Sequence, residues 1–223
     1  MPAYNEEQNI GSVLDRAHKV LRNIGFPYEI IVVDDGSTDN TADVAKKCSV
    51  ILIRNAKNSG KGAALRAGFL CAKGPLVVTM DADGSHQPED IPRLISPIVD
   101  GYDLDATIGS RFADDEGKKS TTKLHLIGNR IINTLILFLT GRQITDSQSG
   151  FRVFRQDCFD KIPFTSSGYE IESEITVKML KNGLKIREVP IVCKQRNSGS
   201  TRINSFADGF RILRAILKST FCS

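Results

Sequence analysis

The chain has 223 residues, of which 40% are apolar and 25% are charged, and this suits one globular domain with a sizeable buried core. Its 18 glycines and 8 prolines show no regular repeat, which excludes collagen-like and low-complexity classes. No run of 18 apolar residues occurs, so we expect no membrane-spanning helix, and the first residues show no secretory signal pattern.

Charge is divided unevenly along the chain. Residues 1–116 contain 12 Lys and Arg against 18 Asp and Glu, a net charge of −6, whereas residues 117–223 contain 18 against 8, a net charge of +10. Acidic side chains can hold a metal ion, and basic ones a phosphate or an anionic surface. The asymmetry therefore suggests two tasks, although an uneven spread of solvated charges also explains it.

The five cysteines, at positions 48, 71, 158, 193 and 222, are odd in number and form no Cys-x-x-Cys pair. Disulfide frameworks and zinc sites show paired spacing instead. We therefore expect free thiols in a reducing cytosol.

The first half of the chain alternates amphipathic segments with short apolar runs. Val13, Ala17 and Leu21 share one helical face, and Gly25 ends that helix. Continuous β-branched runs closed by acidic residues are typical of buried parallel strands. We predict helices over 6–24, 39–47, 60–72 and 88–99, and strands over 29–35, 50–53, 76–80 and 104–109. This alternation predicts a doubly wound α/β sheet.

The second half is less regular. We predict helices over 122–139, 170–181 and 203–218, and a strand over 184–193. No internal repeat occurs, and no linker is long enough to separate two domains cleanly.

The start of the chain lacks an expected strand. The segment Pro2-Ala3-Tyr4-Asn5-Glu6 has the composition of a loop that follows a first strand, yet no strand-length run precedes it. Without that strand a doubly wound sheet loses a central element. We therefore expect either that the chain is truncated at this end or that its start is misassigned.

Acidic side chains gather at or near the ends of predicted strands. Asp34 and Asp35 close one strand, Asp81 and Asp83 follow another, and Asp146 lies in the basic half. Ligands bind beyond the carboxyl ends of strands in open α/β sheets, and crowded carboxylates favour a hard divalent cation. For Asp81 and Asp83 the alternative is a turn that caps the helix over 88–99.

Gly60-Lys61-Gly62 opens a predicted helix, where free amides favour an anion. The segment is not a P-loop, because Asn55 and Gly62 depart from that pattern. A structural helix start explains it equally well. No Gly-x-Gly-x-x-Gly follows the first strand, which disfavours a dinucleotide oxidoreductase.

Seven motifs occur in a fixed order. They are Pro2-Ala3-Tyr4-Asn5-Glu6, Val32-Val33-Asp34-Asp35-Gly36-Ser37-Thr38-Asp39, Asn58-Ser59-Gly60-Lys61-Gly62, Met80-Asp81-Ala82-Asp83, Gly109-Ser110-Arg111-Phe112, Asp146-Ser147-Gln148-Ser149-Gly150-Phe151-Arg152 and Arg196-Asn197-Ser198-Gly199-Ser200-Thr201-Arg202. Together they closely resemble the family 2 glycosyltransferases, and within them the polyprenyl-phosphate sugar synthases. The resemblance implies the α/β GT-A fold, a Rossmann-like, mixed and mainly parallel sheet flanked by helices.

The resemblance assigns Asp81 and Asp83 to a metal ion, Mg²⁺ or Mn²⁺, and to the diphosphate of a nucleotide sugar. Many mannose synthases have a Gln two residues beyond the second Asp as a further ligand, whereas this chain has Ser85 followed by His86. The third protein ligand and the donor therefore stay open. The other candidates for contact with the nucleotide sugar are Pro2, Tyr4, Glu6, Asp35 and Lys61.

The resemblance also implies a basic cluster for the acceptor phosphate, formed by Arg111, Arg130, Arg196 and Arg202. Asp83, Arg111 and Asp146 are the catalytic candidates, with Asp146 orienting the sugar or acting as a base. Further acidic candidates are Glu170, Glu172 and Glu174. Because Glu170 and Glu174 share a helix face, we expect them to be solvated.

The function that the resemblance implies is transfer of a hexose, mannose or glucose, with inversion. The donor is GDP-mannose or UDP-glucose, and the acceptor is a dolichyl or undecaprenyl phosphate. The alternatives are a family 2 transferase that acts on a soluble glycan or polysaccharide, and a catalytically silent subunit that binds nucleotide sugars. A nucleic-acid binder is disfavoured, because no reading motif occurs and aromatic residues are only 7%.

A lipid acceptor places the enzyme at a membrane. We expect a peripheral protein on the cytoplasmic face, with a membrane-anchoring subunit as a possible partner. Residues 1–195 are the predicted catalytic domain; residues 196–223 form a basic loop and an amphipathic helix of the same domain or of a membrane-surface element. The helices over 122–139 and 203–218 carry apolar stripes that suit the membrane surface or the protein core equally. The later stripe comprises Ile203, Phe206, Phe210, Leu213 and Leu217, flanked by Arg211, Arg214 and Lys218.

Overall fold

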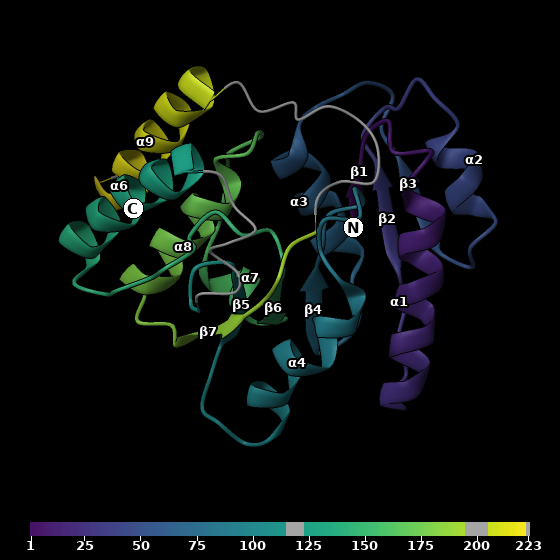
Figure 1. Cartoon of the computed structure of the whole chain (residues 1–223), viewed down its shortest axis with the longest axis horizontal. Coiled ribbons are helices and arrows are strands. Elements are labelled where there is room, and N and C mark those ends of the chain that lie inside the picture. The colour runs from purple at the N-terminus through teal and green to yellow at the C-terminus, as the bar shows by residue number, and fades with distance from the viewer. Residues whose placement is uncertain (115–122, 195–204, 222–223) are drawn as a thin grey trace.

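The computed structural model describes residues 1–114, 123–194 and 205–221, and its strands form two hydrogen-bonded sheets (Figure 1). The first sheet is parallel, in the order β1 (Pro2–Ala3), β2 (Ile31–Asp34) and β3 (Ile51–Arg54). The second has the order β4 (Leu76–Thr79), β6 (Arg152–Arg155), β5 (Ala106–Ser110) and β7 (Ile186–Pro190).

The predicted helices form within a few residues of their expected bounds. They are α1 (Ile10–Ile24), α2 (Thr41–Lys46), α3 (Lys61–Cys71), the 3-10 turn η1 (Pro88–Asp90) with α4 (Ile91–Val99), α6 (Lys123–Thr140), α8 (Ile171–Lys181) and α9 (Ser205–Phe221). A further short helix, α7 (Cys158–Lys161), was not predicted. None of the described helices is long and apolar enough to cross a bilayer.

The first strand corrects one expectation. Pro2 and Ala3, predicted as loop, form a two-residue strand that runs parallel to β2, opposite Val33 and Asp34. The Met1 carbonyl continues this contact by accepting a hydrogen bond from the Val33 amide at 2.9 Å. Among the described strands β1 has no ladder to β4, so the sheet is divided in two at this point.

Strand β6 has a direction that shapes the site. It runs antiparallel to both β4 and β5, whereas β5 and β7 are parallel. Its first residue therefore lies at the edge where β4 and β5 end. This strand was not predicted, because the four residues Arg152–Arg155 begin and end with arginine and leave no apolar run.

Helices cover both faces of the four-stranded sheet. On one face, Val13 of α1 and Leu94 of α4 pack with Val153 of β6. On the other face, Phe69 of α3 and Ile175 of α8 pack with Phe154, the next residue of β6. Alternate side chains of a single strand thus reach two cores, as expected for a sheet buried on both sides.

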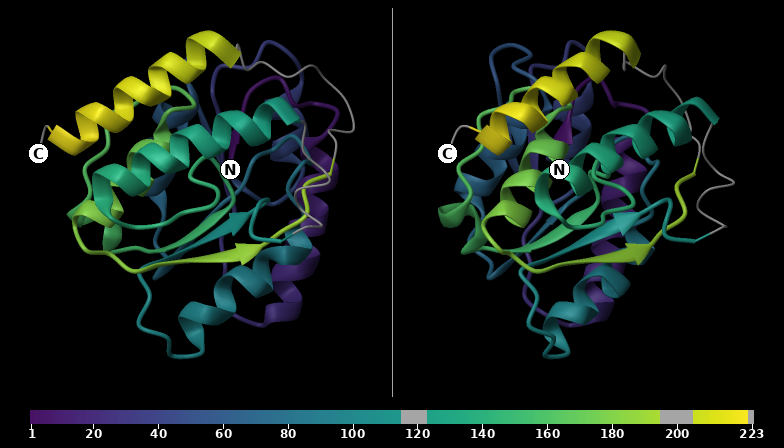
Figure 2. Two further views of the ribbon diagram at one scale, coloured as in Figure 1. Left: turned by 60° about the vertical axis from the view of Figure 1, so that its left-hand side comes forward. Right: turned by 90° about the vertical axis from the view of Figure 1, so that its left-hand side faces the viewer.

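Helices α6 and α9 form a further layer outside α8 (Figure 2). Ile136 of α6 and Ile212 and Ile216 of α9 pack around Val177 of α8. The described part of the apolar stripe predicted for α9 points away from this core. Its members Phe210, Leu213 and Leu217 are 69%, 39% and 40% exposed.

Candidate active site

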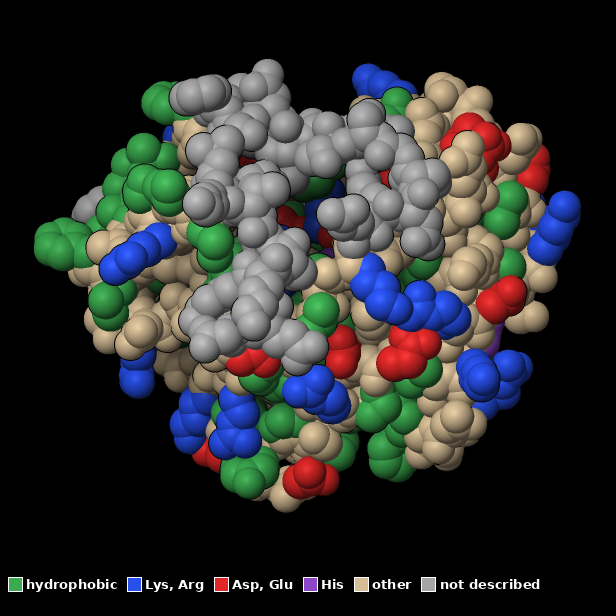
Figure 3. All heavy atoms as spheres, viewed as in Figure 1, with side chains coloured by type: hydrophobic (Ala, Val, Ile, Leu, Met, Phe, Trp, Pro, Cys, Tyr) green, Lys and Arg blue, Asp and Glu red, His purple; other side chains and the backbone are tan. Residues whose placement is uncertain are grey.

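One edge of the two sheets collects the predicted site residues. Asp35 follows β2, Asp81 follows β4 after one residue, and Arg111 follows β5. Because β6 is antiparallel, Gly150, two residues before that strand, lies at the same edge. Figure 3 shows acidic and basic side chains together in a hollow on this side of the molecule.

Lys61 lies between two carboxylates. Its Nζ is 2.6 Å from Asp81 Oδ1 and 2.6 Å from Glu172 Oε1, and its side chain is 13% exposed. Burial acts to lower the pKa of Lys61, but the charges of Asp81 and Glu172 outweigh it and hold that pKa above its ordinary value. A full positive charge therefore sits against the first aspartate of the Asp-x-Asp motif.

Three glycines allow this cluster to close. A Cβ on Gly150 would lie 2.7 Å from Lys61 Nζ, and Cβ atoms on Gly60 and Gly62 would each lie 2.2 Å from a backbone oxygen of Ser166 or Ser167. Gly60 also has a φ of +95°, which other residues adopt at a cost. The start of α3 and the segment before α8 can therefore meet only because Gly60 and Gly62 have no side chain.

We expected the free amides at the start of α3 to favour an anion, and the anionic group that they bind is the carboxylate of Asp35 in the same chain. The Gly60 amide donates to Asp35 Oδ2 at 2.7 Å, and the Gly62 amide donates to the Ser167 carbonyl at 2.7 Å. Asp35 also accepts from the Ser59 amide and from Asn55 Nδ2. Of the two interpretations of this glycine motif, the structure supports the structural helix start.

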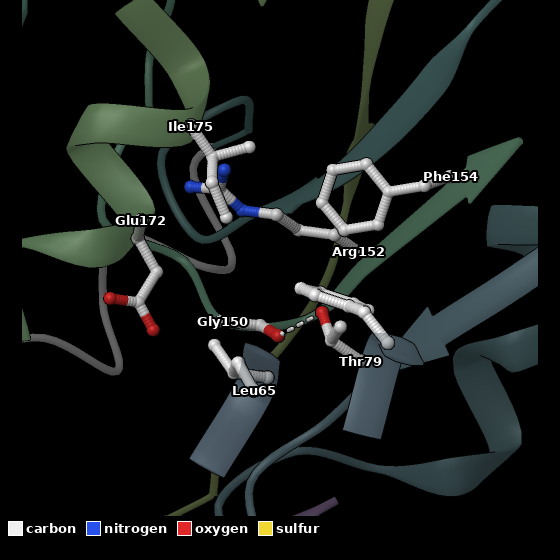
Figure 4. Close-up of a pocket in the computed structure, with 8 residues that line it drawn as sticks. Leu65, Thr79, Gly150, Arg152, Phe154, Glu172 and Ile175 are labelled. Atoms are coloured by element: carbon white, nitrogen blue, oxygen red, sulfur yellow. Dashed lines mark hydrogen bonds between the residues drawn. The ribbon is translucent and has the colours of Figure 1, made fainter. Parts of the chain in front are cut away.

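Below this cluster lies a small internal cavity of about 10 Å³. Thr79 Oγ1 donates to the Gly150 carbonyl at 2.8 Å in its lining, and Glu172 lines the cavity from α8 (Figure 4). The cavity is lined by Leu65, Phe69, Thr79, Gly150, Arg152, Phe154, Glu172 and Ile175. It is too small for a substrate, so ligands must bind outside it at the sheet edge.

The Asp-x-Asp turn is held by its own neighbours. Ser85 donates to Asp83 Oδ1 from its amide at 2.9 Å and from its hydroxyl at 2.6 Å. The Asp81 amide donates to His86 Nδ1 at 3.2 Å, and the buried imidazole packs on Phe151. Burial lowers the pKa of His86. Ser85 thus orients Asp83.

Metal binding fits these residues only in part. Within the described ranges, no group of three or more His, Cys, Asp or Glu side chains is arranged to hold a metal ion. Asp81 and Asp83 supply two hard carboxylates, and magnesium or manganese needs only one or two when phosphate oxygens and water complete its shell. Lys61 shows that Asp81 accepts a cation here. The donor set suits a divalent ion that binds together with a phosphorylated ligand.

Arg111 and Asp146 form a closed pair. Arg111 donates from Nε to Asp146 Oδ2 at 2.7 Å and from its terminal nitrogen to Oδ1 at 2.8 Å, and the Arg111 amide adds a third bond. Asp146 is fully buried. Burial acts to lower the pKa of Arg111, and the Asp146 charge more than offsets this and raises it.

The loop that carries Asp146 is fixed by residues that the sequence analysis missed. Glu188 of β7 accepts from the amides of Thr145 and Asp146, at 2.8 Å each, and its burial raises the pKa of its carboxyl. Asn129 and Asn133 of α6 each donate from Nδ2 to the Thr145 carbonyl at 2.6 Å. Their spacing of four residues on one helix face was a usable signal.

Arg152 has a structural position. It is 1% exposed and donates to the carbonyls of Ser147 and Ser149 and to Thr176 Oγ1 of α8. Burial lowers its pKa to about 10. This arginine holds the loop before β6 against α8 instead of facing a ligand.

The expectation that Glu174 is solvated is wrong. Glu174 is 3% exposed, pairs with Lys178 at 2.8 Å and accepts from the amides of Thr165 and Ser166. Although burial acts to raise the pKa of Glu174, these donors lower it. Glu170 is half-buried and accepts from the Gly168 amide at 3.1 Å. Both glutamates order the segment that covers the start of α3.

The remaining candidates are spread out. Pro2 lies in β1, half-buried Tyr4 follows that strand, and Glu6 accepts from Asn9 Nδ2 at 2.7 Å. Arg130 is exposed on α6. Arg196 and Arg202 lie outside the described residues, so the structure describes two of the four arginines predicted for the acceptor phosphate, Arg111 and Arg130.

Comparison with known proteins places the chain in a class. The model of glycosyl transferase family 2 matches residues 1–163. The chain belongs to this family and is a glycosyltransferase.

Several relatives match nearly the whole chain. An uncharacterized protein of Methanocaldococcus jannaschii is 39% identical over 99% of this chain and 91% of its own length. Polyprenol monophosphomannose synthase of Mycolicibacterium smegmatis is 32% identical over 98% of this chain and 83% of its own length. The dolichyl-phosphate hexose transferase of Haloferax volcanii is 33% identical over 98% and 91%. The predicted resemblance is confirmed.

The fold is likewise confirmed. The crystal structure of glucosyl-3-phosphoglycerate synthase from Mycobacterium tuberculosis, in complex with Mn²⁺, uridine diphosphate and phosphoglyceric acid, superposes with a TM-score of 0.77. It is 22% identical and covers 99% of this chain and 76% of that one. The chain thus has the GT-A architecture predicted from its motifs.

Proposed function

We propose that this protein transfers a hexose from a nucleotide diphosphate sugar to a polyprenyl phosphate at a membrane surface. The observation that carries the proposal is one sheet edge that joins an Asp-x-Asp turn, beside Lys61, with Arg111 beyond the next parallel strand. Relatives named for polyprenol monophosphomannose and dolichyl-phosphate hexose transfer, matched over 98% of this chain, support it.

Asp81 and Asp83 would hold the divalent ion, Mg²⁺ or Mn²⁺. When bound, such an ion withdraws charge from the leaving diphosphate. The Mn²⁺ and uridine diphosphate in the structure of the mycobacterial neighbour are compatible with this assignment. Pro2, Tyr4, Glu6 and Asp35 stay predictions for the nucleoside, since Asp35 already binds the loop from Asn55 to Gly60.

Arg111 is the proposed binding group for the acceptor phosphate. A phosphate monoester is already ionised near neutral pH, so it needs positioning more than it needs a strong base. Asp146 is buried with both oxygens bonded to Arg111. We therefore assign Asp146 to holding the guanidinium and not to proton removal. A single displacement by the phosphate oxygen inverts the anomeric centre.

The surface of α6 and α9 is the proposed membrane contact. Phe138 and Ile131 on α6 and Phe210 on α9 are 85%, 64% and 69% exposed. The exposed basic residues Arg130, Arg142, Arg211, Arg214 and Lys218 lie on or directly after the same helices. An apolar face with a basic flank fits an anionic lipid surface, so residues 205–221 both pack on the catalytic domain and face the lipid.

We place the enzyme on the cytoplasmic face of the membrane, and its cysteines support this placement. Cys48, Cys71, Cys158 and Cys193 are free thiols, which suits a reducing compartment.

The test is a transfer assay with detergent-solubilised polyprenyl phosphate, Mn²⁺ or Mg²⁺, and labelled GDP-mannose or UDP-glucose in parallel. We expect label in the organic phase with one donor, loss of transfer with EDTA, and at least a thousandfold loss (~4 kcal/mol) in Asp83→Asn. Asp100→Asn, at an exposed aspartate after α4, is the matched control. Transfer to a soluble glycan but not to the lipid would reject the lipid acceptor.

A further inference from the structure

We propose that Lys61 is an internal cation that occupies Asp81 in the empty site, so that a divalent metal binds tightly only together with the nucleotide diphosphate. The inference rests on the proposed function, because it assumes that Asp81 and Asp83 hold the metal. It adds an order of assembly to that site and a role for Glu172.

Geometry restricts where Lys61 can go. It is the first residue of α3, and its ammonium lies at 2.6 Å from both Asp81 Oδ1 and Glu172 Oε1. The backbone of Gly150 closes one side, since a Cβ there would lie 2.7 Å from Nζ. The ring of Tyr169 lies 5.9 Å from the ammonium. The cation is enclosed and has two anionic partners within reach.

A metal ion that binds without nucleotide is repelled by the positive charge of Lys61. A divalent ion on Asp81 would stand within a few ångströms of the Lys61 ammonium, and like charges repel strongly in a partly buried site. A diphosphate removes the conflict, because its oxygens offer new anionic ligands to both cations. Metal and nucleotide therefore strengthen each other's binding, and the coupling is reciprocal.

Glu172 is a second anionic partner for Lys61. It is 4% exposed at the start of α8, pairs with Lys61 at 2.6 Å, and its charge also acts on the buried guanidinium of Arg152. When a metal takes Asp81, Lys61 remains paired with Glu172 and its charge is not left buried alone. Glu172 is thus a positioning residue that acts through Lys61.

Substitutions of Lys61 and of Glu172 should change the affinity for Mn²⁺ in opposite directions. Lys61→Met removes the competing charge and leaves two carboxylates near the site, so its affinity for Mn²⁺ alone should rise by about tenfold while its affinity for the nucleotide falls. Glu172→Gln leaves Lys61 with Asp81 as its one anionic partner, so affinity for Mn²⁺ should fall by about tenfold. General structural damage would lower both affinities.

The measurement is a titration of the intact protein with Mn²⁺, followed by the electron paramagnetic resonance signal of the free ion, with and without UDP or GDP. Wild type should bind Mn²⁺ at least about tenfold more tightly with one nucleotide present. Lys57→Met, at an exposed lysine of the same loop, should behave as wild type. Circular dichroism checks the fold of each variant.

The outcomes separate the two proposals. Absence of Mn²⁺ binding even with UDP or GDP would overturn the proposed function. Tight binding of Mn²⁺ by wild type without nucleotide, or no gain in Lys61→Met, would overturn the role of Lys61 and leave the proposed function standing. If Lys61→Met does not fold, Glu172→Gln decides: unchanged or tighter Mn²⁺ binding rejects the inference.

Discussion

The two ionic clusters of the site are built differently. Lys61 shares its charge between Asp81 and Glu172, whereas Arg111 forms two parallel bonds with the single carboxylate of Asp146. The glycines around Lys61 bring other segments close to it, but the loop under Asp146 is fixed by Glu188 and by two asparagines of α6. A shared cation can be exchanged for a ligand, while a bidentate pair holds one group in place.

The largest expected effect comes from breaking the pair of Arg111 and Asp146. Asp146→Ala leaves the Arg111 guanidinium, held in a largely enclosed site, without its anion, and should lower the free energy of unfolding by about 3–5 kcal/mol. Urea denaturation measures it. Asp157→Ala removes an exposed partner of Lys161, at 2.9 Å, and should cost less than about 1 kcal/mol. Equal losses in the two variants would contradict the comparison.

Breaking the shared cluster should cost less. In Glu172→Gln the Lys61 ammonium keeps Asp81, so we expect a loss of about 1–2 kcal/mol in the free energy of unfolding, close to the cost of one charged hydrogen bond. The same denaturation series checks it. A loss as large as that of Asp146→Ala would mean that Lys61 depends on Glu172 alone.

Arg111→Lys tests geometry against charge. Lysine keeps the positive charge but cannot form the two parallel bonds to Asp146. We expect KM for the polyprenyl phosphate to rise about tenfold, or ~1.4 kcal/mol, while KM for the nucleotide sugar stays within about twofold. The control is Arg142→Lys, at an exposed arginine after α6. A matching rise in both KM values would argue against an acceptor role.

A single negative charge on the proposed membrane contact of α6 and α9 should weaken vesicle binding. Phe138 is 85% exposed on α6, so Phe138→Asp should reduce binding to vesicles with anionic lipid by about fivefold and change stability by less than ~0.5 kcal/mol. Vesicle sedimentation measures the binding. Leu70→Asp, at a residue 91% exposed on α3, should bind as wild type does. Equal losses would show that the contact is not specific to α6 and α9.

The smallest effect concerns Cys193. Burial raises the pKa of this thiol to about 12, although Arg111 acts to lower it, so at pH 8 almost none is thiolate. Iodoacetamide should modify Cys71 before Cys193 in the native protein, as mass spectrometry of peptides can follow. Rapid modification of Cys193 would show that the Arg111 side of the site opens.

Most of the fold was predictable because its helices and parallel strands have strong apolar patterns. The exceptions have physical reasons. Strand β6 is short and flanked by arginines, and Arg152 is buried only because carbonyls and Thr176 satisfy it. Two-residue β1 forms because β2 offers it a partner. Such elements depend on neighbours that a local pattern does not contain.

The sequence predicted which residues form the site, but not which of them contact one another. Motif order brought Asp81, Lys61 and Arg111 together correctly at one edge. The pairing of Lys61 with Glu172 joins residues over a hundred positions apart, and Glu174 was misjudged because its acceptor role lies with the backbone of Thr165 and Ser166. Contacts of that kind arise from the packing of α8 on α3.

The strand directions also define the edge of the sheet opposite the site, which is suitable for attaching labels. β5 and β7 are parallel, so the turns before them lie opposite the end that carries Arg111. Gly101 and Gly183 in those turns have φ values of +90° and +73°, and no atom lies within 4 Å of a Cβ built there. A fluorophore or spin label inserted beside either glycine would leave the chemistry untouched. Two such labels would report how the enzyme is tilted when it sits on a vesicle.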